Sequence, residues 1–389
     1  MARLRNANPN RKLQRLVREP NLFRRLLHPL EHAVRQVISV EKEQSWFPQF
    51  PVLAHLLCGI YFHLAQCASL RGLLTVLTLR LQERFLQGFP LRRATVSDAN
   101  NSPRRLKVIR GVFAQLVAHA ALVSTTCQNK LARLAALDST LLHCVPSATW
   151  ASFRKKVNAC KAHVLLDLAN AIPRKLILSV GRLHDRKAFL PFLQPGWTYI
   201  VDRAYNDYRV FEHMCEEGIF FVTRLKRNAL YSILRRRPVK RIARKNGVRA
   251  DWEVRLGRGP TTMTATLRIV KFRAEDGRLY YFLTNRLDLS PTTIAQLYHA
   301  RWAIEKFFKW LKRSLRMERS LARSEVGMEI HVLMTLIADT LLKMLVGLRK
   351  GFQHIPIALL RIIHEKLFTR NSTRLLHRLP LAMDIGPPG

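Results

Sequence analysis

One helical segment carries four polar residue types at a spacing that could form a chemical site. Tyr298, Arg301, Glu305 and Lys312 all lie in the segment YHARWAIEKFFKWLKRSL, residues 298–315. At about 100° per residue, the four side chains share roughly a 60° arc, and the apolar side chains lie beside them. A carboxylate on this face would supply hard oxygen ligands for a divalent cation. An ordinary amphipathic helix with an Arg301–Glu305 ion pair would show the same pattern.

The spacing of these four residues resembles the signature of a known family. Tyr298, Arg301, Glu305 and Lys312 match the Y-x2-R-x3-E-x6-K pattern of the insertion sequence 4 family of DDE transposases. Four residue types at three fixed gaps are hard to obtain by chance. The resemblance extends from about residue 134 to residue 348, and it implies that upstream aspartates complete the site.

Two aspartates match that expectation, because each ends an apolar run. They are Asp138 in LAALDSTLL and Asp202 in TYIVDRAYNDY. The motif VDRAY resembles the family's second-aspartate motif, although the family usually has glycine where this chain has Ala204. Asp138 and Asp202 are 64 residues apart, and 103 residues separate Asp202 from Glu305. The longer gap fits members with a β-strand insertion before the glutamate. A turn or strand-end cap is the alternative role for each aspartate.

The resemblance implies metal-dependent cleavage and strand transfer at the ends of an insertion sequence, by cut-and-paste DNA transposition through hairpin-capped ends. Asp138, Asp202 and Glu305 would be the catalytic residues and would hold Mg²⁺, for which Mn²⁺ would substitute. In-line cleavage of a phosphodiester uses two such ions, one for the attacking oxygen and one for the leaving oxygen.

Four further residues are candidate DNA contacts. The resemblance implies that Arg301 and Lys312 contact phosphates near the scissile bond and that Tyr298 orders the DNA end. Trp252 would stack on an unpaired base as the strand ends open, and core packing is the alternative role for its ring.

The charge of the chain predicts a polyanionic partner. Lys and Arg number 66 against 26 Asp and Glu, a formal net charge of +40. Nucleic acid offers dense phosphates that such a chain neutralises. The resemblance specifies double-stranded DNA, namely the terminal inverted repeats and the target, bound by a homodimer. The alternatives are a catalytically inactive sequence-specific DNA-binding derivative, an RNA-binding or ribosome-associated protein, and a membrane-surface protein.

An all-helical start followed by short apolar runs that alternate with helical segments predicts an α/β fold. With the family resemblance, this implies an all-helical DNA-binding region before an RNase H-like core that is interrupted by a β-strand insertion. Helices are expected before residue 127, with a polar connection at 91–102. The predicted divisions are a helical DNA-binding region (1–127), the first part of the core (128–223), a basic β-strand insertion (224–284), the C-terminal helices of the core (285–350) and a basic tail (351–389).

Individual elements follow from short apolar runs. Strands are predicted at 131–145, 162–168, 175–180, 197–201, 219–223, 262–272 and 279–285, and helices at 187–193 and 208–217. The first run is rich in Leu and Ala, which suit a helix equally well. A helical segment is expected from Ser290, an N-cap followed by Pro291, to about Leu348.

Other features predict a cytoplasmic protein without a membrane span. The six cysteines show no metal-binding spacing, and the basic N-terminus lacks the apolar core of a secretory signal. The apolar stretches 52–74 and 331–348 carry polar side chains and predict buried helices. Asp167 is a weaker candidate for a fourth acidic site residue, and a strand-end polar role is the alternative.

Overall fold

The computed structural model describes residues 22–65, 67, 69–80, 91–123, 133–154, 157–183, 185–318, 320 and 322–346. The predicted basic tail at 351–389, the basic start at 1–21 and the predicted boundary at 127 lie outside these residues. The chain divides into two compact units. The helical unit comprises residues 1–124, 144–150 and 310–389, and the sheet unit comprises residues 125–143 and 151–309. The division therefore falls within a single helix, between Lys309 and Trp310.

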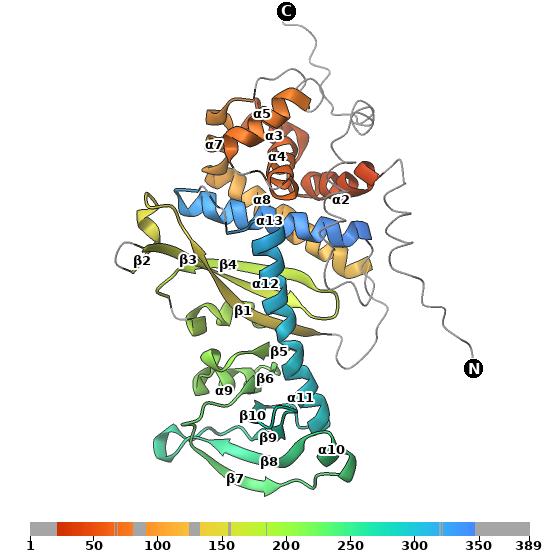
Figure 1. The fold of residues 1–389 in the computed structure, drawn as a ribbon, viewed down its shortest axis with the longest axis vertical. Helices are drawn as coiled ribbons and strands as arrows, with labels where there is room; N and C mark the ends of the chain where they lie inside the picture. The colour runs from red at the N-terminus through yellow and green to blue at the C-terminus, as the bar shows by residue number, and fades with distance from the viewer. Residues whose placement is uncertain are drawn as a thin grey trace, which may run out of the picture. The chain divides into compact units, whose positions relative to one another are not determined.

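The helical unit is organised around two long helices that are neighbours (Figure 1). These are α8 (Pro103–Val123) and α13 (Glu325–Val346), and α13 also packs against α4 (Val52–Leu64) and α2 (Leu22–Val37). Helices α3 (Val40–Trp46) and α5 (Leu70–Arg80) complete the set with α7, described below. Within the described residues, no helix is both long enough and apolar enough to cross a membrane.

The polar connection predicted at 91–102 is wrong, because most of it is helix α7 (Arg93–Asn100). Val96 and Ala99 lie three residues apart and are both buried, so this short helix buries one narrow apolar face. At its end, the side-chain amide of Asn101 donates to the carbonyl of Ser97 at 2.7 Å. The polar composition of this stretch suggested a loop, but a short helix that buries only two side chains can be mostly polar.

The sheet unit contains a ten-stranded mixed sheet with the order β2-β3-β1-β5-β6-β10-β9-β8-β7, and β4 also pairs with β3. The strands are β1 (Leu134–His143), β2 (Ser152–Arg154), β3 (Val157–Asp167), β4 (Ile172–Val180), β5 (Thr198–Val201), β6 (Phe220–Arg224), β7 (Tyr231–Arg236), β8 (Val248–Leu256), β9 (Leu267–Arg273) and β10 (Leu279–Thr284). Pairing is parallel between β1 and β5 and between β5 and β6, and antiparallel elsewhere. The mixed α/β prediction is therefore confirmed.

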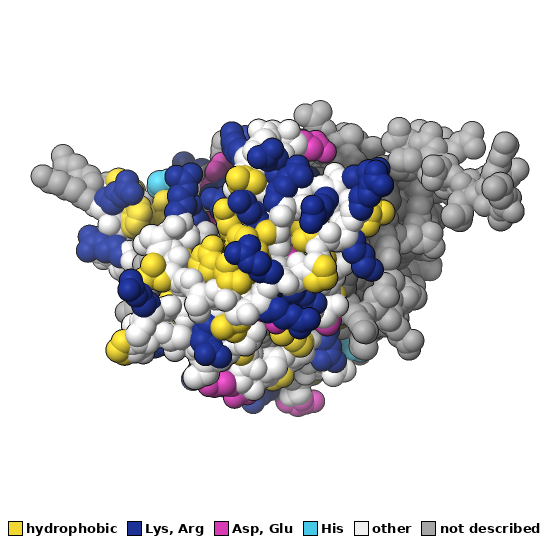
Figure 2. Space-filling model, turned by 90° about the horizontal axis from the view of Figure 1, so that it is seen from below, with side chains coloured by type: hydrophobic (Ala, Val, Ile, Leu, Met, Phe, Trp, Pro, Cys, Tyr) yellow, Lys and Arg dark blue, Asp and Glu magenta, His cyan; other side chains and the backbone are white. Residues whose placement is uncertain are grey.

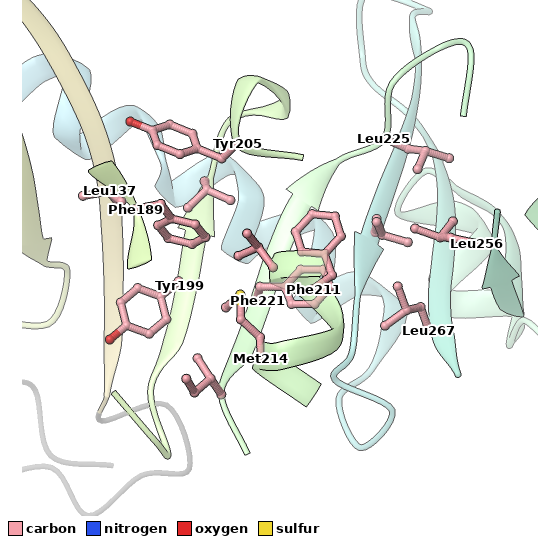
Figure 3. Close-up of a cluster of buried hydrophobic side chains, with 14 of the residues drawn as sticks. Leu137, Phe189, Tyr199, Tyr205, Phe211, Met214, Phe221, Leu225, Leu256 and Leu267 are labelled. Atoms are coloured by element: carbon pink, nitrogen blue, oxygen red, sulfur yellow. The ribbon is translucent and has the colours of Figure 1, made fainter. Parts of the chain in front are cut away.

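Apolar side chains cover both faces of this sheet, as the buried run of β5 requires. On one face α9 (Tyr208–Glu216) packs on the strands, and the rings of Phe211 and Phe221 stack with centroids 4.3 Å apart (Figure 3). On the other face lie α10 (Arg241–Lys245) and α11 (Pro291–Ala300), which bury Ala243 and Ile294 in a second cluster. Each fully buried Leu or Phe stabilises the fold by about 1.5–3 kcal/mol.

The predicted helix at 187–193 is replaced by two short 3₁₀ turns, η2 (Asp185–Ala188) and η3 (Leu190–Phe192). Pro191 lies inside this segment, and proline supplies no backbone donor for a longer helix. Phe189 and Phe192 are still buried, so the segment contributes to the core without forming a regular helix.

A buried ion pair fixes the loop that starts α11. The guanidinium of Arg268 on β9 donates from Nε and Nη2 to the two carboxylate oxygens of Asp251 on β8, each at 2.7 Å. Its Nη1 donates to the carbonyl oxygens of Arg286, at 3.1 Å, and Leu289, at 2.6 Å. Ser290 then caps α11 through its Oγ, which accepts from the amide of Thr293. The pair thereby ties two strands to the start of the helix that carries Tyr298.

Candidate active site

Two aspartates come together because β1 and β5 are parallel neighbours. Leu137 on β1 is in register with Val201 on β5, so Asp138 and Asp202 follow side by side. Asp138 lies inside the long strand β1, whereas Asp202 directly follows the last residue of β5. The sequence prediction that each aspartate ends an apolar run thus corresponds to adjacent positions on the sheet.

Asp138 is held in a partly buried position that disfavours its charge. Its Oδ1 accepts from the amide of Ser139 at 2.8 Å, and its side chain is 24% exposed. The pKa of Asp138 is raised to about 6, mainly by burial and also by the negative charges of Asp202 and Glu305, while the amide of Ser139 and the charge of Arg301 act in the opposite direction. A cation bound at this position would stabilise the ionised form of Asp138 against both the cost of burial and the repulsion by the other two carboxylates.

Asp202 is oriented by the backbone and by a tyrosine. It caps the 3₁₀ turn η4 (Arg203–Tyr205), where its Oδ1 accepts from the amide of Arg203 at 2.7 Å. The hydroxyl of Tyr298 on α11 also donates to Asp202 Oδ1, at 3.5 Å. Burial raises the pKa of Tyr298, so its hydroxyl keeps its proton and acts as a donor at neutral pH.

The single helix predicted over 298–315 is wrong in one respect, because it breaks at Arg301. Helix α11 ends at Ala300 and α12 (Trp302–Ser314) begins at Trp302. The amide of Arg301 donates to Tyr298 and the amide of Ile304 donates to Arg301, both three residues back, so the chain tightens at this point. A projection onto one continuous helix therefore misplaces Tyr298 relative to Glu305.

At that break, Arg301 links two of the three carboxylates. Its Nη2 lies 2.5 Å from Glu305 Oε1, and its Nη1 lies 3.6 Å from Asp138 Oδ2. The arginine side chain is 12% exposed, whereas that of Glu305 is 48% exposed. The guanidinium is also 5.8 Å from the ring centroid of Tyr298. The structure thus brings Tyr298, Arg301, Asp138 and Glu305 into one site with Asp202.

The side chains of this site suit a divalent metal ion in type and charge. Three carboxylates offer hard oxygen ligands of the kind that Mg²⁺ prefers. In the part of the chain that the structure describes, no three carboxylate, histidine or cysteine side chains converge closely enough to hold a metal. The cation that contacts Asp138 and Glu305 in this arrangement is the guanidinium of Arg301. The three carboxylates therefore have the type of donor atom that a divalent metal ion needs. In this structure the guanidinium of Arg301 balances part of their negative charge.

Sequence reasoning missed a polar cluster behind Asp138. Asp185 Oδ1 accepts from Ser139 Oγ at 2.9 Å and from Lys161 Nζ at 3.1 Å, and the buried His163 Nδ1 is 3.8 Å away. Burial lowers the pKa of His163 to about 4, so its ring is neutral at pH 7. Ser139 therefore contacts both aspartates, since its amide donates to Asp138 and its hydroxyl donates to Asp185. The only signal in the sequence was an acidic residue in an otherwise basic chain.

Three other candidate residues have different surroundings. Lys312 is on α12 but belongs to the helical unit, and burial lowers its pKa. Trp252 on β8 packs against the cluster on the α9 face of the sheet, whereas Asp202 is two residues beyond Ile200, which belongs to the opposite cluster. Asp167 accepts from the amide of Ala169 and pairs with Arg174, which is the strand-end role predicted as its alternative.

Comparisons with known proteins match most of the sheet unit and α13. The model of the transposase DDE domain family matches residues 129–341. The protein y4zB of Sinorhizobium fredii, named as a transposase, is 28% identical over 292 residues, which is 73% of this chain and 80% of that protein. A protein of Geobacillus stearothermophilus, named as the transposase of insertion sequence element IS5377, is 25% identical over 217 residues, or 56% of this chain and 57% of that protein. A solved piggyBac transposase synaptic complex with hairpin DNA aligns with a TM-score of 0.42 at 10% identity, over 98% of this chain and 84% of that chain.

Proposed function

This chain belongs to the transposase DDE domain family and is a DNA transposase, and we propose that it cleaves and joins DNA at the ends of an insertion sequence. The observation that carries the proposal is the register of β1 and β5, which sets Asp138 beside Asp202, together with the link from Asp138 to Glu305 through Arg301. No finding favours the alternative of a catalytically inactive DNA-binding derivative.

The three carboxylates would hold the metal that this chemistry uses. Asp138, Asp202 and Glu305 would be the ligands of Mg²⁺, with Mn²⁺ as a substitute. When bound, the metal activates the attacking oxygen and stabilises the leaving oxygen of the phosphodiester. The protein prepares the site by fixing Asp138 through Ser139 and Asp202 through Arg203 and Tyr298.

We assign the chain to the insertion sequence 4 type, with an RNase H-like core. The support is the set Tyr298, Arg301, Glu305 and Lys312 at the spacing of that family's signature. The parallel strands β1, β5 and β6, flanked by the antiparallel strand β3, agree with such a core. This type implies cut-and-paste movement through hairpin-capped ends and a homodimeric working complex.

The basic residues of the signature would hold the DNA. The guanidinium of Arg301 lies beside Asp138 and Glu305. It would pair with a phosphate of the scissile strand when DNA is bound, because a planar guanidinium binds two phosphate oxygens. Lys312 would contact a neighbouring phosphate, and Tyr298 would order the end of the strand beside Asp202. A stacking role for Trp252 would require its ring to leave the core cluster that it packs on.

The test is cleavage of duplex DNA that carries the inverted repeats flanking this gene, in the presence of Mg²⁺. Wild-type protein should nick at the repeat ends, and Asp138→Ala, Asp202→Ala and Glu305→Ala should each abolish nicking while DNA binding changes by no more than a few-fold. Asp276→Ala is a matched control, since Asp276 is an exposed carboxylate in the β9–β10 hairpin. Near wild-type cleavage by any of the three variants would remove that residue from the site.

A further inference from the structure

The register of the sheet brings a distant part of the sequence to the same end as the carboxylates. Ile200 on β5 is aligned, through the paired residues of β6, β10 and β9, with Glu253 on β8 and Arg235 on β7. Asp202 follows Ile200 by two residues. Strand β8 runs in the opposite direction to β5, so its first residue, Val248, lies toward the end of the sheet where Asp202 lies. Helix α10 directly precedes that residue and therefore lies at the end of the sheet where Asp202 lies.

The side chains gathered there are strongly basic. Every exposed charged side chain between residues 226 and 258 is a lysine or an arginine. The two acidic residues of this segment are engaged, since Asp251 pairs with Arg268 and Glu253 lies 3.6 Å from Arg237. Figure 2 looks at the molecule from the side of β7 and β8, and Lys and Arg side chains are spread over that face. We call the following set the basic rim: Arg235, Arg236, Lys240, Arg241, Arg244, Lys245 and Arg249.

The helical part of the rim also shares a face of the sheet with the aspartates. Ala243 of α10 and Ile200 of β5 belong to the same buried cluster. Since alternate residues of a strand point to the same face, Asp202 lies on the face that α10 covers. Four strand spacings separate β5 from β8 and five separate β5 from β7, which is about 19–24 Å at ~4.8 Å per spacing.

The rim suits a polyanion better than a second copy of this chain. Apolar side chains are exposed among its charges, Leu234 at 47% and Ile242 at 69%. If two copies met through their rims, the seven positive charges of one copy would face the seven of the other. Like charges that face each other at an interface are strongly unfavourable. The phosphates of a duplex would instead neutralise the rim and release their counterions.

We propose that the basic rim binds the sugar-phosphate backbone of duplex DNA about six or seven base pairs from the phosphate at Asp138 and Asp202, given a rise of ~3.4 Å per base pair. The DNA is the same continuous duplex that enters the carboxylate site, so the assignment rests on the proposed function. The rim then measures a fixed length of duplex from the cut and holds it in register.

The first test compares two double variants of equal charge. Arg241→Gln with Lys245→Gln neutralises two of the three rim residues on α10. Arg133→Gln with Arg258→Gln neutralises two exposed arginines at the opposite end of the sheet, before β1 and after β8. Binding of a fluorescein-labelled duplex of arbitrary sequence is measured by anisotropy across a salt series. We expect the rim variant to lower the salt slope by about two units, at ~0.9 per phosphate contact, and the control to leave it unchanged.

The second test locates the contact on the DNA. Neutral methylphosphonates replace single phosphates along a duplex carrying the gene's flanking repeats, and binding is measured with wild-type protein and the rim variant. Substitution about six or seven base pairs from the cleavage position should weaken wild-type binding and have little further effect on the rim variant. Equal salt slopes for the two double variants, or coupling to phosphates next to the cut, would overturn the assignment. A wild-type protein that binds in this way but never cleaves would contradict the proposed function and leave the rim's contact with DNA standing.

Discussion

Arg301 contacts Glu305 across a helix break, with Nη2 and Oε1 2.5 Å apart, and the two residues do not belong to one continuous helix. The tight turn at Arg301 lets the same guanidinium reach Asp138 on β1. An ion pair on an exposed helix face would have no such third partner. The arginine therefore acts as an internal counter-charge of the carboxylate site, and this has measurable consequences.

Loss of this counter-charge should affect cleavage and metal binding in opposite directions. We expect Arg301→Ala to slow single-turnover cleavage at saturating DNA by about tenfold or more, because the arginine stabilises charge on the transferring phosphate. Arg301→Lys should recover only part of the rate, since lysine cannot form a bidentate contact. Without DNA, Arg301→Gln should bind Mn²⁺ several-fold more tightly, measured by electron paramagnetic resonance. Arg278→Gln, an exposed arginine of the β9–β10 hairpin, is the control, and unchanged cleavage with lowered melting temperature would refute the active-site role of Arg301.

The Asp185 cluster should matter for the rate and much less for DNA affinity. Asp185→Asn keeps the shape of the side chain but weakens its contacts with Ser139 and Lys161, which position the strand around Asp138. We expect cleavage at saturating DNA to fall several-fold, with duplex affinity within twofold of wild type. Asp167→Asn perturbs a buried aspartate at the other end of the same sheet region and should leave the cleavage rate unchanged. Equal rates for both variants would show that Asp185 has no positioning role.

The buried pair of Arg268 and Asp251 should dominate the stability of the start of α11. Asp251→Ala leaves a guanidinium that is 1% exposed without its carboxylate, and removal of one partner of a buried pair costs about 3–5 kcal/mol. The free energy of unfolding, measured in urea, should fall by that amount. Asp276→Ala should change it by less than about 0.5 kcal/mol. Replacement of both buried residues by apolar ones should be much milder than the single change, and equal losses would contradict this account.

Acidification should destabilise the helical unit through two neighbouring histidines. The rings of His63 and His331 lie 4.8 Å apart, and burial lowers the pKa of His63 to about 3 and that of His331 to about 4. Both must be neutral in the folded state, whereas unfolded histidine has a pKa of about 6.5. Stability should therefore be complete above pH 6.5 and fall as the pH drops from there toward about 3, the pKa of His63 in the folded state. The melting temperature against pH measures this, with exposed His299→Gln expected to follow wild type and His63→Asn to show a weaker pH dependence.

The sequence predicted the aspartates better than their connections. Asp138 and Asp202 could be located because each follows an apolar run that a buried parallel strand requires. The break at Arg301 could not, because a helical projection assumes one axis and nothing in the local composition interrupts it. The contacts of Asp185 could not either, because Ser139 lies on β1 and Lys161 on β3, and Asp185, in the turn η2, meets them only in the folded protein.

The basic segment also showed its charge in the sequence, but not where that charge would lie. Strands β9 and β10 were predicted from their alternating side chains, whereas β7, β8 and helix α10 were not predicted, because their many Lys and Arg side chains hide the apolar positions. The order of the strands, which sets α10 at the same end of the sheet as Asp202, depends on pairings between residues far apart in the chain. Periodicity reports the face of a strand and not its neighbours.

The pairing of β6 with β10 has a practical consequence for anyone who shortens this protein. Residues 224–284 extend the same sheet through that pairing, so they cannot be excised as a separate module. A truncated chain would present β6, whose residues Phe221 and Val222 are buried, as an open edge with unsatisfied backbone donors and acceptors. Such edges recruit other chains, so truncated proteins should collect in inclusion bodies. Charge-neutralising substitutions in the full-length chain are the safer route to separate the roles of the segment.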